Sequence, residues 1–148
     1  MKALIAAAAL SFAALPAFAD GHGRTPANPE AKVYFATLED GATVSGPVTV
    51  VFGLSGMGVA PAGVEREMTG HHHLLLNRVP YGDLETDAEF FEFGIPGDDN
   101  HIHFGGGQTE TVLELAPGTY TLQLLLGDVD HIPHEPVIVS EQITIVVE

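Results

Sequence analysis

The chain has 148 residues, no cysteine and a formal net charge of −15 at pH 7. Such acidity argues against nucleic acid and anionic membrane surfaces as partners and favours cations, while the lack of cysteine excludes thiolate metal sites and cysteine nucleophiles. Because 45% of the residues are hydrophobic, the chain can still fold around one core.

The first 19 residues have the pattern of a cleavable secretory signal peptide. Lys2 provides the basic start, an apolar run extends from Ala3 to Leu15, and Ala17-Phe18-Ala19 has the small-residue pattern that signal peptidase cleaves. The apolar run is shorter than the roughly 20 residues of a membrane-spanning helix. We therefore expect cleavage after Ala19, a periplasmic or secreted protein, and no membrane insertion after cleavage.

The remaining chain divides into a leader and one domain. Residues 20–31 contain Gly, Pro, Asn and Thr without an apolar period, which is typical of a flexible leader. We predict that residues 32–148 form a single histidine-rich domain.

Six segments of this domain have the alternating or Val-rich pattern of β-strands, and turn residues separate them. In chain order they are Lys32–Leu38, Pro47–Leu54, His71–Asn77, Thr109–Leu115, Thr119–Leu126 and Gln142–Val147. No segment has a sustained helical period. The pattern predicts an all-β fold, an antiparallel immunoglobulin-like β-sandwich of about seven strands. One long loop, from Pro80 to Asn100, has no clear pattern.

Six of the eight histidines form three close pairs. The pairs are His71/His73, His101/His103 and His131/His134. Side chains two apart on a strand point to the same face, so each of the first two pairs presents its imidazoles together. If the two strands are neighbours, four imidazoles converge, and the loop from Asp128 brings His131 or His134 over them. Imidazole without thiolate suits zinc, copper, nickel or iron, and we predict a copper or zinc site.

Residues next to the pairs have candidate supporting roles. His72 must face away from His71 and His73, so we expect it to be structural or exposed. The glycines at 105–107, which follow His103 after Phe104, allow a close backbone approach. Four polar residues either orient the imidazoles through hydrogen bonds or are ordinary polar residues of strands and loops. These are Gln108, Thr109, Glu110 and Asp128.

Cleavage after Ala19 would create a possible second metal site at Asp20-Gly21-His22. A free amine, two deprotonated amides and the imidazole at the third position can hold Cu(II) or Ni(II) in a square plane. This possibility favours copper over zinc as the bound ion.

Three motifs resemble those of a family of small secreted bacterial proteins with a domain of unknown function. The motifs are G-H-H-H-L-L, H-x-H-F-G-G-G-Q-T-E and G-D-x-x-H-x-P-H, and they lie here within residues 70–76, 101–110 and 127–134. The resemblance extends from Lys32 to the C-terminus. It implies the extent of the domain and no particular chemistry.

Three classes of function fit these patterns. The favoured hypothesis is an exported protein that buffers, carries or senses copper or zinc through its paired histidines. The alternatives are a structural or partner-binding envelope module with hydrogen-bonded histidines, and a metal-dependent enzyme with a cupin-like histidine site. No nucleophile or general acid stands out, so a role other than catalysis is favoured and no catalytic residue is assigned.

Overall fold

Residues 23–148, the part of the chain that the computed structural model describes, form two β-sheets and a short helical insert. The smaller sheet has the strand order β1 (Lys32–Phe35), β3 (Val48–Ser55) and β7 (Glu110–Leu113). The larger sheet has the order β2 (Ala42–Val44), β9 (Ile143–Val147), β8 (Gly118–Gly127), β5 (Thr69–Leu76) and β4 (Gly58–Val59), and β6 (His101–His103) also pairs with β5. The insert contains a 3-10 helix, η1 (Glu85–Glu89), and α1 (Phe90–Phe93).

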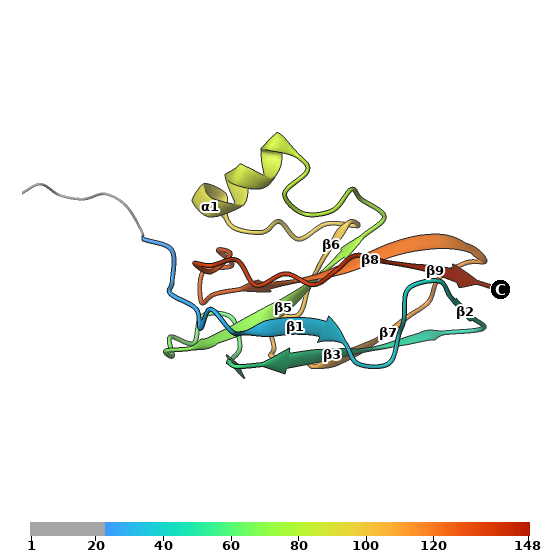
Figure 1. Cartoon of the computed structure of the whole chain (residues 1–148), viewed down its shortest axis with the longest axis horizontal. Coiled ribbons are helices and arrows are strands. Elements are labelled where there is room, and N and C mark those ends of the chain that lie inside the picture. The colour runs from blue at the N-terminus through green and yellow to red at the C-terminus, as the bar shows by residue number, and fades with distance from the viewer. Residues whose placement is uncertain (1–22) are drawn as a thin grey trace, which may run out of the picture.

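The two sheets lie one above the other, and the insert with α1 covers the outer side of the larger sheet (Figure 1). Most strand pairs are antiparallel, but β2 runs parallel to β9 and β4 runs parallel to β5. The predicted all-β sandwich is therefore confirmed, with mixed rather than purely antiparallel pairing. Within residues 23–148, no helix has the length and apolar character needed to cross a membrane.

All six predicted strands are present, as β1, β3, β5, β7, β8 and β9. Three further strands, β2, β4 and β6, are only two or three residues long. An alternating pattern is not recognisable over so few residues, which explains why the predicted number of about seven is too low. The predicted signal peptide and the possible site at Asp20-Gly21-His22 lie outside the described residues.

Aliphatic side chains fill the space between the sheets. The larger sheet contributes alternate residues of β5 and β8, and the smaller sheet contributes alternate residues of β3. Fully or almost fully buried members of this core include Val48, Val50, Phe52, Leu74, Leu122, Leu124 and Leu126. His72 lies on the same face of β5 as Leu74, and its ring packs 5.0 Å from that of Phe52.

The opposite face of β5 is buried beneath the insert. Phe90 and Ile95 pack on Leu75 and Leu125 in a second apolar cluster. A buried ion pair between Arg78 and Asp87 fixes the insert to the end of β5. Because both of its faces are covered, β5 is buried along seven of its eight residues. Histidines on this strand are consequently withdrawn from water on either side.

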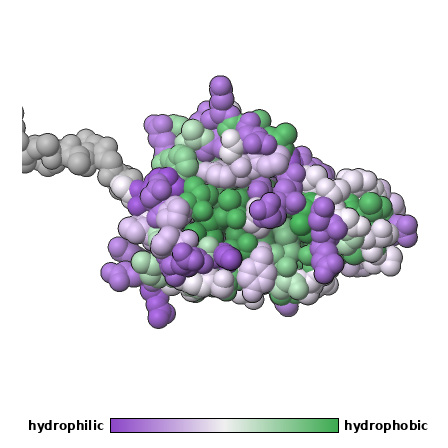
Figure 2. Space-filling model, viewed as in Figure 1, coloured by the Kyte–Doolittle hydropathy of each residue, from purple (hydrophilic) through white to green (hydrophobic). Residues whose placement is uncertain are grey.

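A groove runs between β1 and residues 137–143. Figure 2 shows apolar surface in this position, surrounded by hydrophilic residues. The apolar side chains that line the groove include Val33, Phe35, Leu38, Val137, Ile138 and Val139.

Candidate metal centre

Four imidazole rings meet on the insert-covered face of the larger sheet. They belong to His71, His73, His103 and His131, and their ring centroids are separated by 4.6 to 6.0 Å. One nitrogen from each of His71, His103 and His131 lies within 4.8 Å of the other two. The Nε2 atoms of His71 and His73 are 3.0 Å apart. These four residues, called the histidine cluster below, are those that the structure brings together.

Strand pairing explains which histidines meet. In the antiparallel register of β5 and β6, His73 is opposite His103 and Leu75 is opposite His101. His71 and His73 share a face of β5 because they are two residues apart. The register therefore places His103 beside this pair and moves His101 away along the strand.

The fourth ring comes from the loop that follows β8. Asp128 is buried at its start, and one carboxylate oxygen, Oδ1, accepts hydrogen bonds of 2.9 Å from the backbone N–H groups of Asp130 and Ile132. His131 has a φ of 69°, in the left-handed region that non-glycine residues rarely adopt. Its carbonyl accepts a 2.8 Å hydrogen bond from the N–H of Ile95 in the insert. The loop is thus shaped on both sides so that His131 reaches the cluster.

Two glycines make room for the rings. A Cβ on Gly105 would lie 2.3 Å from Cε1 of His103, and one on Gly127 would lie 2.9 Å from Nε2 of His73. Real Cβ atoms do not approach other atoms so closely, so a side chain at either position would displace an imidazole. The close approach predicted for the glycine run is present at Gly105.

The separation of the nitrogens fits a metal ion. Zinc–imidazole bonds are about 2.0–2.1 Å long, so two imidazole nitrogens on one tetrahedral or square ion lie roughly 3 Å apart. The 3.0 Å between the Nε2 atoms of His71 and His73 matches this distance and equally matches a hydrogen bond, and the nitrogens of His71, His103 and His131 all lie within 4.8 Å of one another. The Nδ1 atoms of His71 and His73 are buried and have no hydrogen-bond partner among residues 23–148. The same is true of Nε2 of His72 and Nδ1 of His134, which lie outside the cluster, so the unpaired atoms do not by themselves mark a ligand.

Burial favours the neutral form of three rings of the cluster. Removal from water is the main cause that lowers the pKa of His71 to about 4, together with the neighbouring His131 and His103 and against an opposing effect of Asp128. Burial followed by the nearby histidines lowers the pKa of His73 to about 2. Burial and His131 also lower the pKa of His103. Metal ligation needs unprotonated imidazole, and these lowered pKa values keep His71, His73 and His103 in that state at neutral pH.

His101 has partners of its own. Its Nε2 accepts a 2.7 Å hydrogen bond from the guanidinium of Arg78, and its Nδ1 donates one of 2.8 Å to Asp98. Arg78 also forms the buried ion pair with Asp87. His101 was a predicted metal ligand, but both of its ring nitrogens form hydrogen bonds at the two ends of the insert.

His134 and His72 lie elsewhere. The fully buried ring of His134 donates from Nε2 to the carbonyl of Thr69 at 3.1 Å and passes over Gly70, where a Cβ would approach it to 2.8 Å. His72 donates from Nδ1 to the carbonyl of Gln108 at 3.3 Å. These two rings make backbone contacts on the core side of β5 and are separate from the histidine cluster.

Of the four predicted supporting residues, only Asp128 supports a residue of the histidine cluster. Asp128 shapes the loop of His131, as described above. Gln108 contacts His72 through its backbone, and the carbonyl of Thr109 accepts the N–H of Phe52. Glu110 is exposed on β7 in the smaller sheet.

Sequence reasoning missed Thr25, which belongs to the predicted leader. Its hydroxyl donates a 2.5 Å hydrogen bond to Oδ2 of Asp128, and its carbonyl accepts the N–H of Glu135. Arg24 bonds the carbonyl of His134 and stacks over the ring of Phe91 at 4.2 Å. A polar residue in a segment without periodicity gives no signal of such a contact.

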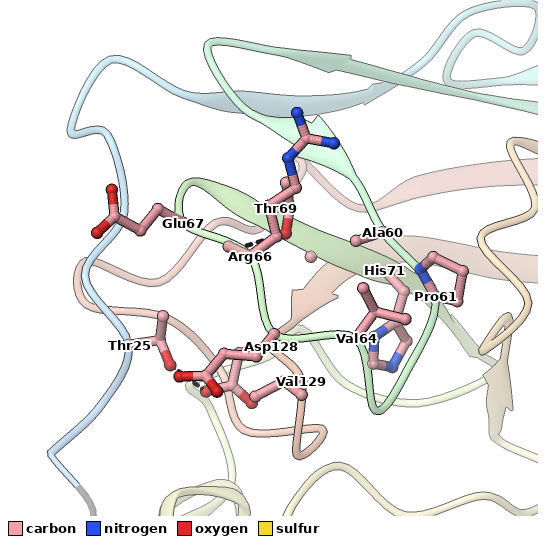
Figure 3. A pocket seen from close by; sticks show the side chains of 12 residues that line it. Thr25, Ala60, Pro61, Val64, Arg66, Glu67, Thr69, His71, Asp128 and Val129 are labelled. Carbon is pink, nitrogen blue, oxygen red and sulfur yellow. Dashed lines mark hydrogen bonds between the residues drawn. The ribbon is translucent and has the colours of Figure 1, made fainter.

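A cavity of about 130 Å³ adjoins His71. Figure 3 shows Val64 and Pro61 beside the His71 ring, and Asp128 bonded to Thr25 on another side. Together with these residues, the cavity is lined by Ala60, Glu65, Arg66, Glu67, Thr69, Gly70 and Val129.

Comparison with known proteins gives a family without a defined activity. The family described as Domain of unknown function (DUF4399) matches residues 50–148. No curated protein and no solved structure matches the chain.

Proposed function

We propose that this protein, which belongs to the DUF4399 family of domains of unknown function, is an exported protein that binds one copper or zinc ion. The observation that carries the proposal is the convergence of His71, His103 and His131, with His73 hydrogen-bonded or co-ligating behind them. The acidic composition supports a cationic ligand, and the signal-peptide pattern supports a periplasmic or secreted location.

The ligand chemistry narrows the choice of ion. A site made of imidazole suits zinc and copper, whereas magnesium and calcium prefer oxygen ligands. Because the pKa values of His71 and His73 are lowered, no proton has to leave these rings before the ion binds at neutral pH. Buffering, carriage or sensing of the metal is the role we propose.

The alternative roles receive less support. Backbone hydrogen bonds to His72 and His134 favour a structural role for these two residues, but they leave the histidine cluster unexplained. A cupin-like enzyme site needs a barrel, and the sheets formed by residues 23–148 do not close into one.

The proposal is tested with a matched pair of variants on one short strand. His103→Gln removes a cluster ligand, whereas His101→Gln changes the neighbouring histidine that faces Arg78 and Asp98. We expect the His103 variant to lower zinc affinity by more than about 100-fold, since even residues behind the ligands affect affinity 10- to 100-fold. The His101 variant should bind zinc as the parent protein does. Isothermal titration of metal-free protein measures both affinities.

Zinc is chosen for this titration because the possible site at Asp20-Gly21-His22 requires a square-planar ion such as Cu(II) or Ni(II). Parallel Cu(II) titrations of protein with a free and with an acetylated N-terminus then report on that second site. Equal zinc binding by the parent and the His103 variant would refute the cluster as a metal site, as would an N-terminally acetylated parent protein that binds neither zinc nor Cu(II).

A further inference from the structure

The groove between β1 and residues 137–143 is bordered by an edge of each sheet. β1 is the end strand of the smaller sheet, and among residues 23–148 no strand pairs with its outer edge. Residues 137–141 form the opposite wall, and Val139 lies beside Leu125 of β8 in the larger sheet. The volume of the groove is about 480 Å³, within the range of ligand-binding clefts.

On the β1 wall, alternate residues turn their backbone polar groups away from the sheet. The N–H of Ala36 donates a 2.9 Å hydrogen bond to the carbonyl of Val51 on β3. Bonded residues alternate along an antiparallel ladder, so the residues two and four positions before Ala36 also face β3 with their backbone groups. The N–H and C=O groups of Val33 and Phe35 consequently point to the outer edge, where the groove lies.

The opposite wall has the same arrangement. The carbonyl of Ile138 accepts a 3.0 Å hydrogen bond from the N–H of Leu126, and the N–H of Ser140 donates one of 2.9 Å to the carbonyl of Leu124. Val139 lies between these bonded residues, so its N–H and C=O groups point away from β8. Both walls therefore present backbone donors and acceptors at their edges.

Both ends of the groove are closed by the chain itself. The N–H of Ala27 donates a 2.8 Å hydrogen bond to the carbonyl of Glu135, so the two walls meet at this end. At the other end the chain crosses from β1 to β2 of the larger sheet, and Leu38 lines the groove there. The β1 wall between these limits, from Ala31 to Leu38, matches an extended segment of about seven residues.

An extended polypeptide suits the chemistry of these walls. The side chains that line the groove are mostly apolar, whereas the backbone groups at its edges are polar (Figure 2). An acyl chain would cover the N–H and C=O groups without bonding them, which costs free energy. An extended segment instead bonds them as an added strand and inserts alternate side chains between the walls.

The charge around the groove selects a basic segment. Glu141 lines the groove, and Glu30 and Glu39 directly precede and follow the part of the chain that lines the β1 wall. All three carboxylates are exposed, and Lys32 is the single basic residue of the lining. A second copy of the chain would bring another net charge of −15 to this surface, so repulsion opposes self-association.

We propose that the groove binds an extended, apolar segment of another protein with basic residues at its ends. The segment adds as a strand to the edge of β1, and the wall of residues 137–141 covers its other side. None of the residues that line the groove belongs to the histidine cluster, so this binding goes beyond the proposed metal site and does not depend on it.

A synthetic peptide of seven residues, Lys-Val-Thr-Val-Thr-Val-Lys with blocked ends, is the probe. Fluorescence anisotropy at low salt should show saturable binding of one labelled peptide per protein. Hydrogen exchange at the amides of Val33, Phe35 and Val139, followed by NMR, should slow at least about tenfold when the peptide is bound, because these groups become paired.

Two control peptides separate the contributions. A peptide with glutamate in place of both lysines should bind at least about tenfold more weakly, because like charges meet at the groove. A peptide with N-methylated valines keeps the apolar side chains but lacks their N–H donors, and it should also bind at least about tenfold more weakly.

Two protein variants with the same change in net charge locate the site. Glu141→Lys should weaken binding of the lysine peptide at least about threefold, as expected for a reversed charge at the rim of an interface. Glu110→Lys, on β7 at the opposite edge of the smaller sheet, should bind the peptide almost as the parent protein does. Both residues are exposed, so both variants should fold, which circular dichroism checks.

Several results would overturn the proposal. Lack of saturable binding up to about 1 mM peptide would do so, as would a larger effect of Glu110→Lys than of Glu141→Lys. Equal affinity of the N-methylated peptide would show an apolar site without strand addition, and equal affinity of the glutamate peptide would exclude selection for a basic segment. A protein that is dimeric without peptide and already protected at Val33 and Phe35 would place a second copy in the groove.

Discussion

Gly105 limits where the ring of His103 can lie. The residue follows β6 and its carbonyl accepts the N–H of Ala62, so its backbone is fixed. The imidazole of His103 occupies the space that a Cβ would need, at 2.3 Å from its Cε1 atom. At the adjacent Gly106, a Cβ would approach only the mobile end of the Gln108 side chain, at 3.1 Å.

The two glycines give a prediction at the scale of one methyl group. Gly105→Ala should force the His103 ring out of the cluster and lower zinc affinity at least about tenfold, as misplacement of a ligand does. Gly106→Ala should bind zinc almost as the parent does, because Gln108 can move. Isothermal titration compares the two, and circular dichroism checks that both proteins fold. Equal affinities would mean that His103 is not held by this contact.

Individual residues also show the limits of sequence reasoning. The pattern of paired histidines correctly indicated that His71, His73 and His103 lie together, because residues two apart on a strand share a face. It did not distinguish His131 from His134 as the loop residue. That distinction depends on backbone geometry, the positive φ of His131, which has no pattern in the sequence.

At the scale of elements, the pairing of β5 with β6 determines the composition of the cluster. A shift of this register by two residues would place His101 opposite His73 and leave His103 outside. The spacing within each pair predicted which histidines share a face, but register depends on turns and on the packing of distant residues. This is why the structure does not bring the predicted ligand His101 into the cluster.

The loop after β8 depends on one carboxylate. Asp128→Ala would leave the N–H groups of Asp130 and Ile132 without their acceptor, at a cost on the order of 2–3 kcal/mol of unfolding free energy. His131 would also lose its support, so zinc affinity should fall. Thr25→Val removes a single hydrogen bond to Asp128 and should cost about 1 kcal/mol.

Urea unfolding and zinc titration measure both effects. Comparable stability of the Asp128→Ala and Thr25→Val proteins would show that the loop is held by other contacts. The Asp128→Ala variant reports on the hydrogen bonds within the loop, and the Thr25→Val variant reports on the hydrogen bond between the N-terminal segment and the loop.

At the scale of the whole molecule, the buried histidines make stability depend on pH. The pKa of His71 is lowered from 6.5 to about 4 in the folded protein. As the pH falls, His71 is therefore protonated in the unfolded chain at a higher pH than in the folded protein. The unfolding free energy of metal-free protein should be highest above pH 6.5 and should decrease below it, by up to about 1.4 kcal/mol per pH unit for each such group. Measurement between pH 6.5 and 5 avoids most carboxyl titration.

His71→Gln tests the assignment, because glutamine does not titrate. The unfolding free energy of this variant should change less steeply with pH than that of the parent protein. The difference in slope should correspond to at most one proton taken up on unfolding. Identical slopes for the two proteins would show that His71 is protonated in the folded state as readily as in the unfolded chain.

The fold as a whole was more predictable than the site. Alternating or Val-rich patterns over four or more residues, with turn residues between them, identified β1, β3, β5, β7, β8 and β9. The insert was not predictable, because its burial rests on Phe90, Ile95 and the ion pair of Arg78 with Asp87. These contacts join residues from separate segments, and their side chains show no common period.

One face of β5 packs between the two sheets, and the opposite face carries histidines of the cluster. This separation has an evolutionary consequence. Leu74 and its neighbours join the sheets, whereas His71 and His73 face the insert and contribute nothing to the contact between the sheets. Descendants of this protein can therefore exchange or lose the imidazoles without giving up the sandwich. Relatives that keep the leucines of β5 and β8 but vary at positions 71, 73, 103 and 131 would share an ancestor and a fold with this protein but would lack the proposed metal site.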